Sequence, residues 1–347
     1  MFVGANAGGR GVFNLNGGSL AATGIAGIPG FSGPVAAEVI GESGIGIFNQ
    51  TGGTNVAGSL VIFAPSGVGS VANLSNAYNL SGGSLSSGTI QNSGTFNYSG
   101  GSLTGNFINW NGAAFNISGS GTMIVNGNLT NNGGTITVTA NQAQFLNVTL
   151  ASGTYNADPS TNIFQTLDVG AAAYITGVIG DVFKVNGNFQ NLSTQNSLWN
   201  TSAAELDFTG GGLHTFNLAG QNGAGFSNNF AWNILSIGAG NKLNLGAGSG
   251  DALYVNFLQG LVISGNLITN IDGAAGLFLY YNPVDNPFLS GNYSLTGGGQ
   301  LIAAGPLTAT PEPSSIVLMI TGLAALLGYA LWRKRAATAR HLASLPS

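Results

Sequence analysis

Apolar and polar side chains alternate residue by residue over many short segments of this chain, and glycine-rich stretches separate the segments. In Gly94–Ser99 (GTFNYS), the two aromatic residues fall on one face of a predicted strand and the intervening Thr and Asn on the other. The same alternation recurs in Gly134–Thr139 (GTITVT). A period of two is that of a half-buried β-strand, so the body of the chain is predicted to be all-β.

One motif recurs along the first third of the chain: an aromatic residue, then Asn, two further residues and a Gly-rich turn with Ser or Thr. It begins at Phe13, Phe48, Tyr78, Phe96 and Phe115, in steps of 35, 30, 18 and 19 residues. Such self-similarity is typical of solenoids, in which each turn of the chain stacks on the previous one. A turn of roughly 15–20 residues, in places doubled, would account for all four steps.

We therefore predict a parallel β-solenoid, similar to a β-helix, over residues 1–200. The Gly-Gly pairs are expected to supply the positive φ of sharp corners, and the recurring Asn residues to stack into ladders. Strand signals continue through residues 201–305, where we predict terminal turns and a cap, because an open solenoid end has to be covered. A β-sandwich, or a pair of them, is the alternative that the same pattern permits.

The C-terminal region departs from this pattern. Residues 313–332 carry no charge over 20 positions, which as a helix would measure about 30 Å, the thickness of the hydrocarbon core of a bilayer. We predict a single transmembrane α-helix at residues 316–332, with Tyr329 and Trp332 near the membrane interface. A buried core helix is the alternative, although such a helix would normally show a polar face.

The residues on both sides of the predicted span fit this topology. Three basic residues follow it at once, Arg333, Lys334 and Arg335. They begin a tail, residues 333–347, that is expected to stay in the cytoplasm, which places residues 1–310 outside the inner membrane. Two prolines precede the span and fix φ, so the linker at residues 306–315 is predicted to be extended and accessible.

The order Pro311-Glu312-Pro313, apolar span and basic cluster resembles the PEP-CTERM sorting tail of Gram-negative bacteria. The resemblance implies recognition by exosortase, a membrane protease-transpeptidase that acts near the tripeptide and releases or transfers the protein at the cell surface. It also implies a link to exopolysaccharide and biofilm. The segments Leu206–Gly212 and Gly238–Leu243 are similar to the passenger regions of exported bacterial repeat proteins.

Composition narrows the possible functions. Only 5% of the 347 residues are charged and 58 are Gly, against an average of about 25% charged residues. Three basic residues precede the predicted span, so nucleic-acid binding is not expected. Without Cys there are no disulfides, Cys nucleophiles or Cys-containing zinc sites. The first residues show no export signal, so we expect the natural protein to begin differently from Met1.

Candidate catalytic groups are few. Glu205 and Asp207 lie two residues apart on a predicted strand, so they share a face, and His214 follows. Paired carboxylates of this kind can serve glycoside hydrolysis. The plainer interpretation is a solvated strand face, and we predict no catalytic residue.

A second set of candidates is similar to the groups that polysaccharide lyases on parallel β-helices use, namely acids that bind calcium and a basic proton acceptor. The set is Asp158, Asp168, Asp181 and Lys184. We predict no metal and no cofactor, and expect a structural or adhesive exported protein whose neutral polar faces contact polysaccharide or other copies. A surface polysaccharide lyase or hydrolase is the alternative, and a fragment of a larger adhesin is a third possibility.

Overall fold

The computed structural model describes residues 1–23, 38–65 and 75–304, all within one compact unit, Met1–Pro306. These residues form β-strands and connections without an α-helix, so the all-β prediction is confirmed. The predicted linker, transmembrane helix and basic tail, with their motif residues, lie outside the described residues. Over the ranges that are described, no helix is long and apolar enough to cross a membrane.

The described residues contain 24 strands. In chain order they are β1 (Phe2–Val3), β2 (Arg10–Leu15), β3 (Ser19–Ala22), β4 (Glu38–Ile40), β5 (Ile45–Gln50), β6 (Thr54–Ile62), β7 (Ala77–Asn92), β8 (Thr95–Trp110), β9 (Ala114–Ile117), β10 (Thr122–Asn126), β11 (Leu129–Val138), β12 (Gln142–Ala157), β13 (Thr161–Thr176), β14 (Val182–Asn191), β15 (Thr201–Phe208), β16 (Gly212–Leu218), β17 (Trp232–Ile237), β18 (Asn241–Ala247), β19 (Ala252–Gln259), β20 (Ile263–Ser264), β21 (Leu267–Gly273), β22 (Phe278–Tyr281), β23 (Tyr293–Thr296) and β24 (Gln300–Ala303).

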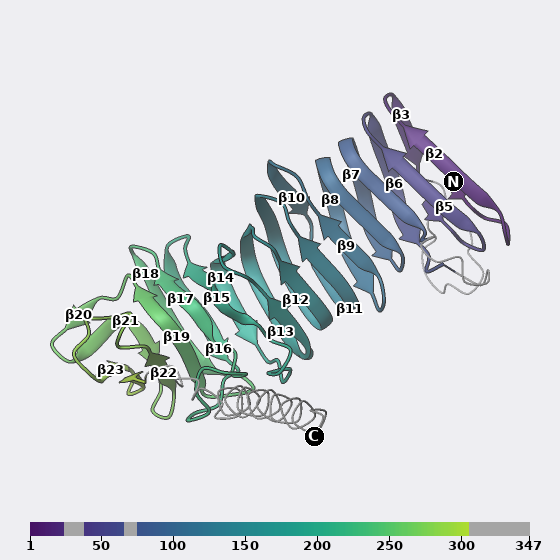
Figure 1. Ribbon diagram of the computed structural model, residues 1–347. Helices are drawn as coiled ribbons and strands as arrows, with labels where there is room; N and C mark the ends of the chain where they lie inside the picture. Colours follow the sequence, from purple (N-terminus) through teal and green to yellow (C-terminus); the bar gives the residue numbers. More distant parts are fainter. Residues whose placement is uncertain (24–37, 66–74, 305–347) are drawn as a thin grey trace, which may run out of the picture. The chain divides into compact units, whose positions relative to one another are not determined.

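Apart from β20, each strand pairs in parallel with a strand one turn of chain earlier or later, as Figure 1 shows from the purple strands to the green ones. We call one such turn a coil. The two antiparallel strand pairs among the described residues lie near the C-terminal end, β20 with β21 and β23 with β24. A β-sandwich is built from antiparallel sheets, so that alternative is wrong for the described residues.

The five aromatic residues of the sequence motif lie in register on successive coils. Phe13 is paired with Phe48, Phe48 with Tyr78, Tyr78 with Phe96, and Phe96 with Phe115. The first two steps, of 35 and 30 residues, are therefore single coils and not doubled ones, which corrects the prediction of a uniform short turn. Coil length varies because the connections between strands can lengthen without disturbing the strands that stack.

The aromatic rings stack into what we call the aromatic column, formed by Phe13, Phe48, Tyr78 and Phe96. Successive ring centroids lie 4.9, 4.6 and 5.1 Å apart. The Phe48 and Tyr78 rings are tilted by 7° and the Tyr78 and Phe96 rings by 2°. Phe115 then meets Phe96 edge-on at 5.6 Å. Stacked and edge-on pairs both add to the free energy gained by burying the rings.

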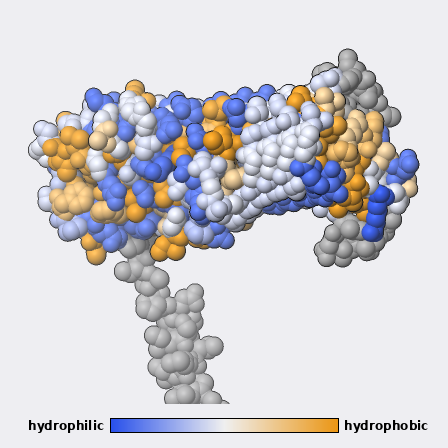
Figure 2. Space-filling view, turned by 90° about the horizontal axis from the view of Figure 1, so that it is seen from above, coloured by the Kyte–Doolittle hydropathy of each residue, from blue (hydrophilic) through white to orange (hydrophobic). Residues whose placement is uncertain are grey.

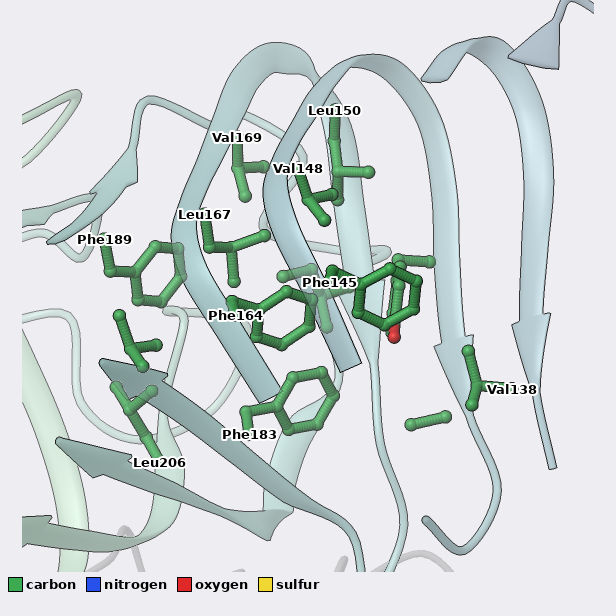
Figure 3. Close-up of a cluster of buried hydrophobic side chains, with 14 of the residues drawn as sticks. Val138, Phe145, Val148, Leu150, Phe164, Leu167, Val169, Phe183, Phe189 and Leu206 are labelled. Atoms are coloured by element: carbon green, nitrogen blue, oxygen red, sulfur yellow. The ribbon is translucent and has the colours of Figure 1, made fainter. Parts of the chain in front are cut away.

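Farther along the chain the same inward alternation builds the core between β12, β13 and β14 (Figure 3). Val148 of β12, Leu167 of β13 and Phe189 of β14 occupy one register position on three successive coils. Phe145 stacks on Phe164 with centroids 5.4 Å apart. Like residues therefore lie above like residues, and one continuous core runs from the first coils to the last.

Glycine pairs form the corners after the motif strands. The second glycine of each pair has a positive φ, at +76°, +70°, +75° and +84° for Gly18, Gly53, Gly83 and Gly101. This confirms the prediction that the pairs supply the left-handed backbone of a sharp corner. A Cβ on Gly53, Gly83 or Gly101 would also come within 2.7 Å of the carbonyl oxygen of the corner glycine on the preceding coil.

Candidate functional site

The predicted trio Glu205, Asp207 and His214 is not brought together. The two carboxylates share the outer face of β15, whose other residues 204, 206 and 208 are buried in the core. The imidazole of His214 points into the core from β16 and is 1% exposed. Its Nδ1 lies 2.8 Å from the Gly187 carbonyl oxygen and its Nε2 2.8 Å from Asn241 Oδ1. His214 is thus a hydrogen-bonded core residue on the face opposite the acids.

The lyase-like set does not converge either. Lys184 Nζ lies 3.9 Å from Asp207 Oδ2, and the pair is partly exposed, so it contributes little to stability. Asp181 accepts hydrogen bonds from the backbone N–H groups of Ser160 and Val178, each at 2.6 Å, and so holds the turn before β14. Asp168 is in register with Gln190, several residues along the coil from Lys184. Within residues 1–23, 38–65 and 75–304, no cluster of three or more His, Cys, Asp or Glu could hold a metal ion.

Three of these acids, Asp168, Asp181 and Glu205, have pKa values that burial raises. Partial burial raises the pKa of Glu205, the charge of Asp207 raises it further, and Lys184 opposes the shift. Burial raises the pKa of Asp181, although the N–H groups that it binds favour the ionised form. Burial is the largest cause of each shift, and the one basic neighbour, Lys184, lowers the pKa of Glu205, so the shifts follow from packing.

An asparagine ladder lies on the outside of the first coils, one residue after each member of the aromatic column. Its members are Asn14, Asn49, Asn79, Asn97 and Asn116. Each side-chain amide after that of Asn14 donates to the amide oxygen of the preceding member, at 2.8, 2.8, 2.7 and 2.8 Å. The predicted ladder is therefore confirmed. Each amide keeps one N–H and one lone pair for solvent or a ligand, which makes this face polar without charge.

The space-filling view agrees with a surface of this kind. In the face shown in Figure 2, a broad area in the middle of the described unit has intermediate hydropathy and is drawn nearly white. Gly, Ser and Thr at outward positions have this character, as in β7 and β8. Hydrophobic and hydrophilic residues are intermixed toward the C-terminal coils (Figure 2). The outer surface therefore offers hydrogen bonds more than charge or large apolar area.

A hollow lies between two long connections of the later coils. It has a volume of about 520 Å³ and is lined by Ser197, residues 199–202, residues 226–231 and Asn256, none of which is charged. We call it the loop pocket. Its two walls are the connection between β14 and β15 and the connection between β16 and β17. No sequence motif marked these residues, because the pocket depends on the two connections meeting at one edge of the stack.

Hydrogen bonds hold both walls of the loop pocket. Trp199 Nε1 donates to Thr201 Oγ1 at 2.7 Å, and this hydroxyl donates to the Ala231 carbonyl oxygen at 2.8 Å, which joins one wall to the other. Within the second wall, the Asn229 side chain binds the Gln221 backbone. Asn229 Oδ1 accepts from the Gln221 N–H at 2.7 Å, and Asn229 Nδ2 donates to the Gln221 carbonyl oxygen at 3.0 Å. The pocket is therefore preformed.

The second wall also holds strained backbone. Asn228 and Phe230 have φ values of +51° and +58°, which non-glycine residues rarely adopt. The Phe230 ring packs edge-on against Trp199 with centroids 5.2 Å apart, and this contact fixes the conformation. Strain that the surrounding structure maintains in this way is concentrated at binding and active sites.

A buried carboxyl group that no sequence motif marks lies at the start of β4. Glu38 is fully buried, and its Oε2 accepts a hydrogen bond from Asn55 Nδ2 at 2.9 Å. The same amide donates to the Tyr78 hydroxyl, which donates in turn to Gln50 Oε1. Glu38 Oε1 and Asn55 Oδ1 have no hydrogen-bond partner. Burial raises the pKa of Glu38 to about 7, against the lowering effect of the Asn55 hydrogen bond.

The stability of the first coils is expected to fall as the pH rises from about 4.5 to about 7. In this interval Glu38 keeps its proton in the folded state and loses it in the unfolded state, so the rising pH favours unfolding. Each pH unit between the two pKa values lowers the free energy of unfolding by about 1.4 kcal/mol, so the total loss of stability reaches about 3 kcal/mol. Hydrogen exchange of residues 38–62 at several pH values, corrected for intrinsic exchange rates, measures it.

Glu38→Gln should remove most of this pH dependence and protect the first coils at pH 8, because the side chain is neutral at every pH. Glu42→Gln, at a partly exposed acid nearby, is the matched control and should keep the wild-type profile. An unchanged slope in Glu38→Gln would show that another group titrates.

Comparison with models of protein families, with curated proteins and with solved structures finds no match to this chain. The function proposed below therefore depends on the chain's own residues.

Proposed function

We propose that this is an exported cell-surface or extracellular protein of structural or adhesive function, with a parallel β-solenoid body. Support for the body comes from the parallel register of successive coils and from the columns of like residues along the stack. Its outer face is polar and nearly uncharged, and exopolysaccharide or further copies of the chain are the partners that such a face suits.

The observation that carries the proposal is the order of residues at the C-terminus. Pro311-Glu312-Pro313, an uncharged span and the cluster Arg333-Lys334-Arg335 follow one another within 25 residues. An accessible proline-rich segment beside a membrane span is what a membrane protease needs in its substrate. We propose that exosortase recognises this tail, that the inner membrane first holds the protein, and that cleavage then delivers it to the surface and the biofilm matrix.

Intact-mass analysis of the surface fraction from the native host tests the sorting step. The wild-type protein is expected to lack everything after about Pro313. Replacing Pro311, Glu312 and Pro313 together with alanine should abolish cleavage and leave the full-length chain in the membrane fraction. Pro306→Ala, in the same linker but outside the tripeptide, should be processed normally. Full-length wild-type protein at the surface, or normal processing of the triple variant, would refute the sorting proposal.

The alternative of a polysaccharide lyase or hydrolase has no observation in its favour among the described residues, because neither candidate set converges on one point. A structural or adhesive role is therefore the function that we develop.

A further inference from the structure

We infer that the loop pocket is a binding site for a short stretch of a neutral saccharide. This inference names a ligand for the exported body proposed above and rests on that proposal. It combines three properties of the pocket, namely its enclosed volume, its uncharged polar lining and the aromatic rings at its margin.

The volume and the rigidity of the pocket suit a small ligand. At about 520 Å³, the pocket falls within the range of roughly 300–1,000 Å³ that is usual for small-molecule sites. The hydrogen bonds from Trp199 to Thr201 and on to Ala231 join the two walls and fix their relative position without a ligand. Preformed walls reduce the conformational entropy that binding would otherwise lose.

The lining selects a neutral and hydroxyl-rich ligand. Exposed side chains of Asn200, Ser202, Ser227 and Asn228 offer amide and hydroxyl groups, each of which both donates and accepts hydrogen bonds. Sugar hydroxyls have the same dual capacity. A charged ligand would lose hydration here without meeting an opposite charge, because no acid or base lines the pocket.

The half-buried Phe226 ring lines the pocket and is supported by two further rings, of which Tyr254 is fully buried. Phe226, half-buried in the second wall, meets Tyr254 edge-on at 5.3 Å, and Tyr254 stacks on Tyr280 at 4.5 Å. These rings belong to a cluster separate from the main core. An aromatic face beside neutral amides matches a pyranose ring, which has an apolar C–H face and a rim of hydroxyls.

The three longest strand-free connections in residues 75–304 meet around this region. The connection before β17 and the one before β15 form the pocket walls. The third, between β22 and β23, is tied to the Asn256 backbone through Asn286, whose Nδ2 donates to the Asn256 carbonyl oxygen at 2.7 Å. Elsewhere in that range most connections are tight corners that the stack itself requires. Long, well-held connections at one edge of a regular scaffold are where binding sites occur.

Titration of the full-length protein with neutral tetrasaccharides tests the inference. The protein is held in a detergent without a sugar headgroup, and cellotetraose, laminaritetraose and maltotetraose are added in turn. The chain has four Trp residues, so the Trp199 indole N–H gives a signal that can be assigned by substitution. We expect at least one of the three sugars to shift this signal saturably. Tetragalacturonate is the charged comparison and should bind more weakly.

Two variants locate the site. Ser227→Trp fills the pocket and should weaken binding about tenfold or more, while Ser120→Trp, at an equally exposed serine before β10, should have no effect. Asn228→Gly removes one amide and tolerates the local φ of +51°, so it should fold normally and still bind less tightly.

The inference is wrong if none of the three sugars shifts the Trp199 signal, if Ser227→Trp and Asn228→Gly both bind like the wild type, or if the charged sugar binds better. Sorting is measured separately, by the mass of the surface form, so a failure of binding and a failure of the proposed export can be told apart.

Discussion

Replacing Phe96 with alanine is expected to lower the stability of the surrounding coils by about 3–5 kcal/mol. The ring is fully buried, stacks on Tyr78 at 5.1 Å, and meets Phe107 and Phe115 edge-on at 5.2 and 5.6 Å. The backbone hydrogen bonds between neighbouring coils fix their spacing. The coils therefore cannot collapse into the space that the ring leaves, and the cavity remains.

Because each coil contacts only its neighbours, the loss should be local. Hydrogen exchange followed by mass spectrometry should show lost protection in β7, β8 and β9, and little change in β18 and β19. Phe13→Ala removes a half-buried ring from the first coil of the same column and should cost clearly less. Uniform loss of protection along the chain, or an equal cost for the two variants, would contradict the nearest-neighbour description.

The stacking of the first coils could be predicted from the sequence because the residues that stack are identical or similar. An aromatic residue followed by Asn marks each of these coils. Identical or similar residues on successive coils stabilise the stack, because the rings stack on one another and the amides form hydrogen bonds. The motif therefore located Phe48, Tyr78 and Phe96 in their observed register. The coil lengths were not predictable, since lengthening a connection leaves these columns unchanged.

The candidate sites were less predictable, because they depend on which face of a strand points inward and on which connections meet. Glu205 and Asp207 do share a face, as their spacing indicated, but His214 faces the core. Glu38 is buried in the core beside an Asn55 amide from a later strand, a long-range contact that no local sequence pattern indicates. The loop pocket combines residues that are about 30 positions apart in the sequence and carry no charge, and such residues form no recognisable motif.

Replacing Gly83 with alanine is expected to destabilise the first coils by about 2–5 kcal/mol, the sum of two effects. The φ of +75° would strain any residue with a Cβ, at a cost of about 1–2 kcal/mol. The Cβ would also lie 2.3 Å from the Gly53 carbonyl oxygen and 2.5 Å from the Gly52 carbonyl carbon. These are backbone atoms of the preceding coil, so the two coils would have to separate, at a further cost of about 1–3 kcal/mol.

Gly18→Ala separates the two effects, since Gly18 has nearly the same φ, +76°, but nothing lies within 4 Å of its Cβ position. Gly18→Ala should lower the free energy of unfolding only by the cost of the backbone strain, about 1–2 kcal/mol. Urea denaturation of both variants, with hydrogen exchange of β6 and β7 to locate the loss, measures the difference. Equal costs at the two positions would mean that the corner glycines are required for their backbone conformation only. A larger cost at Gly83 would show that close contact between coils also requires glycine there, as at the equivalent Gly53 and Gly101.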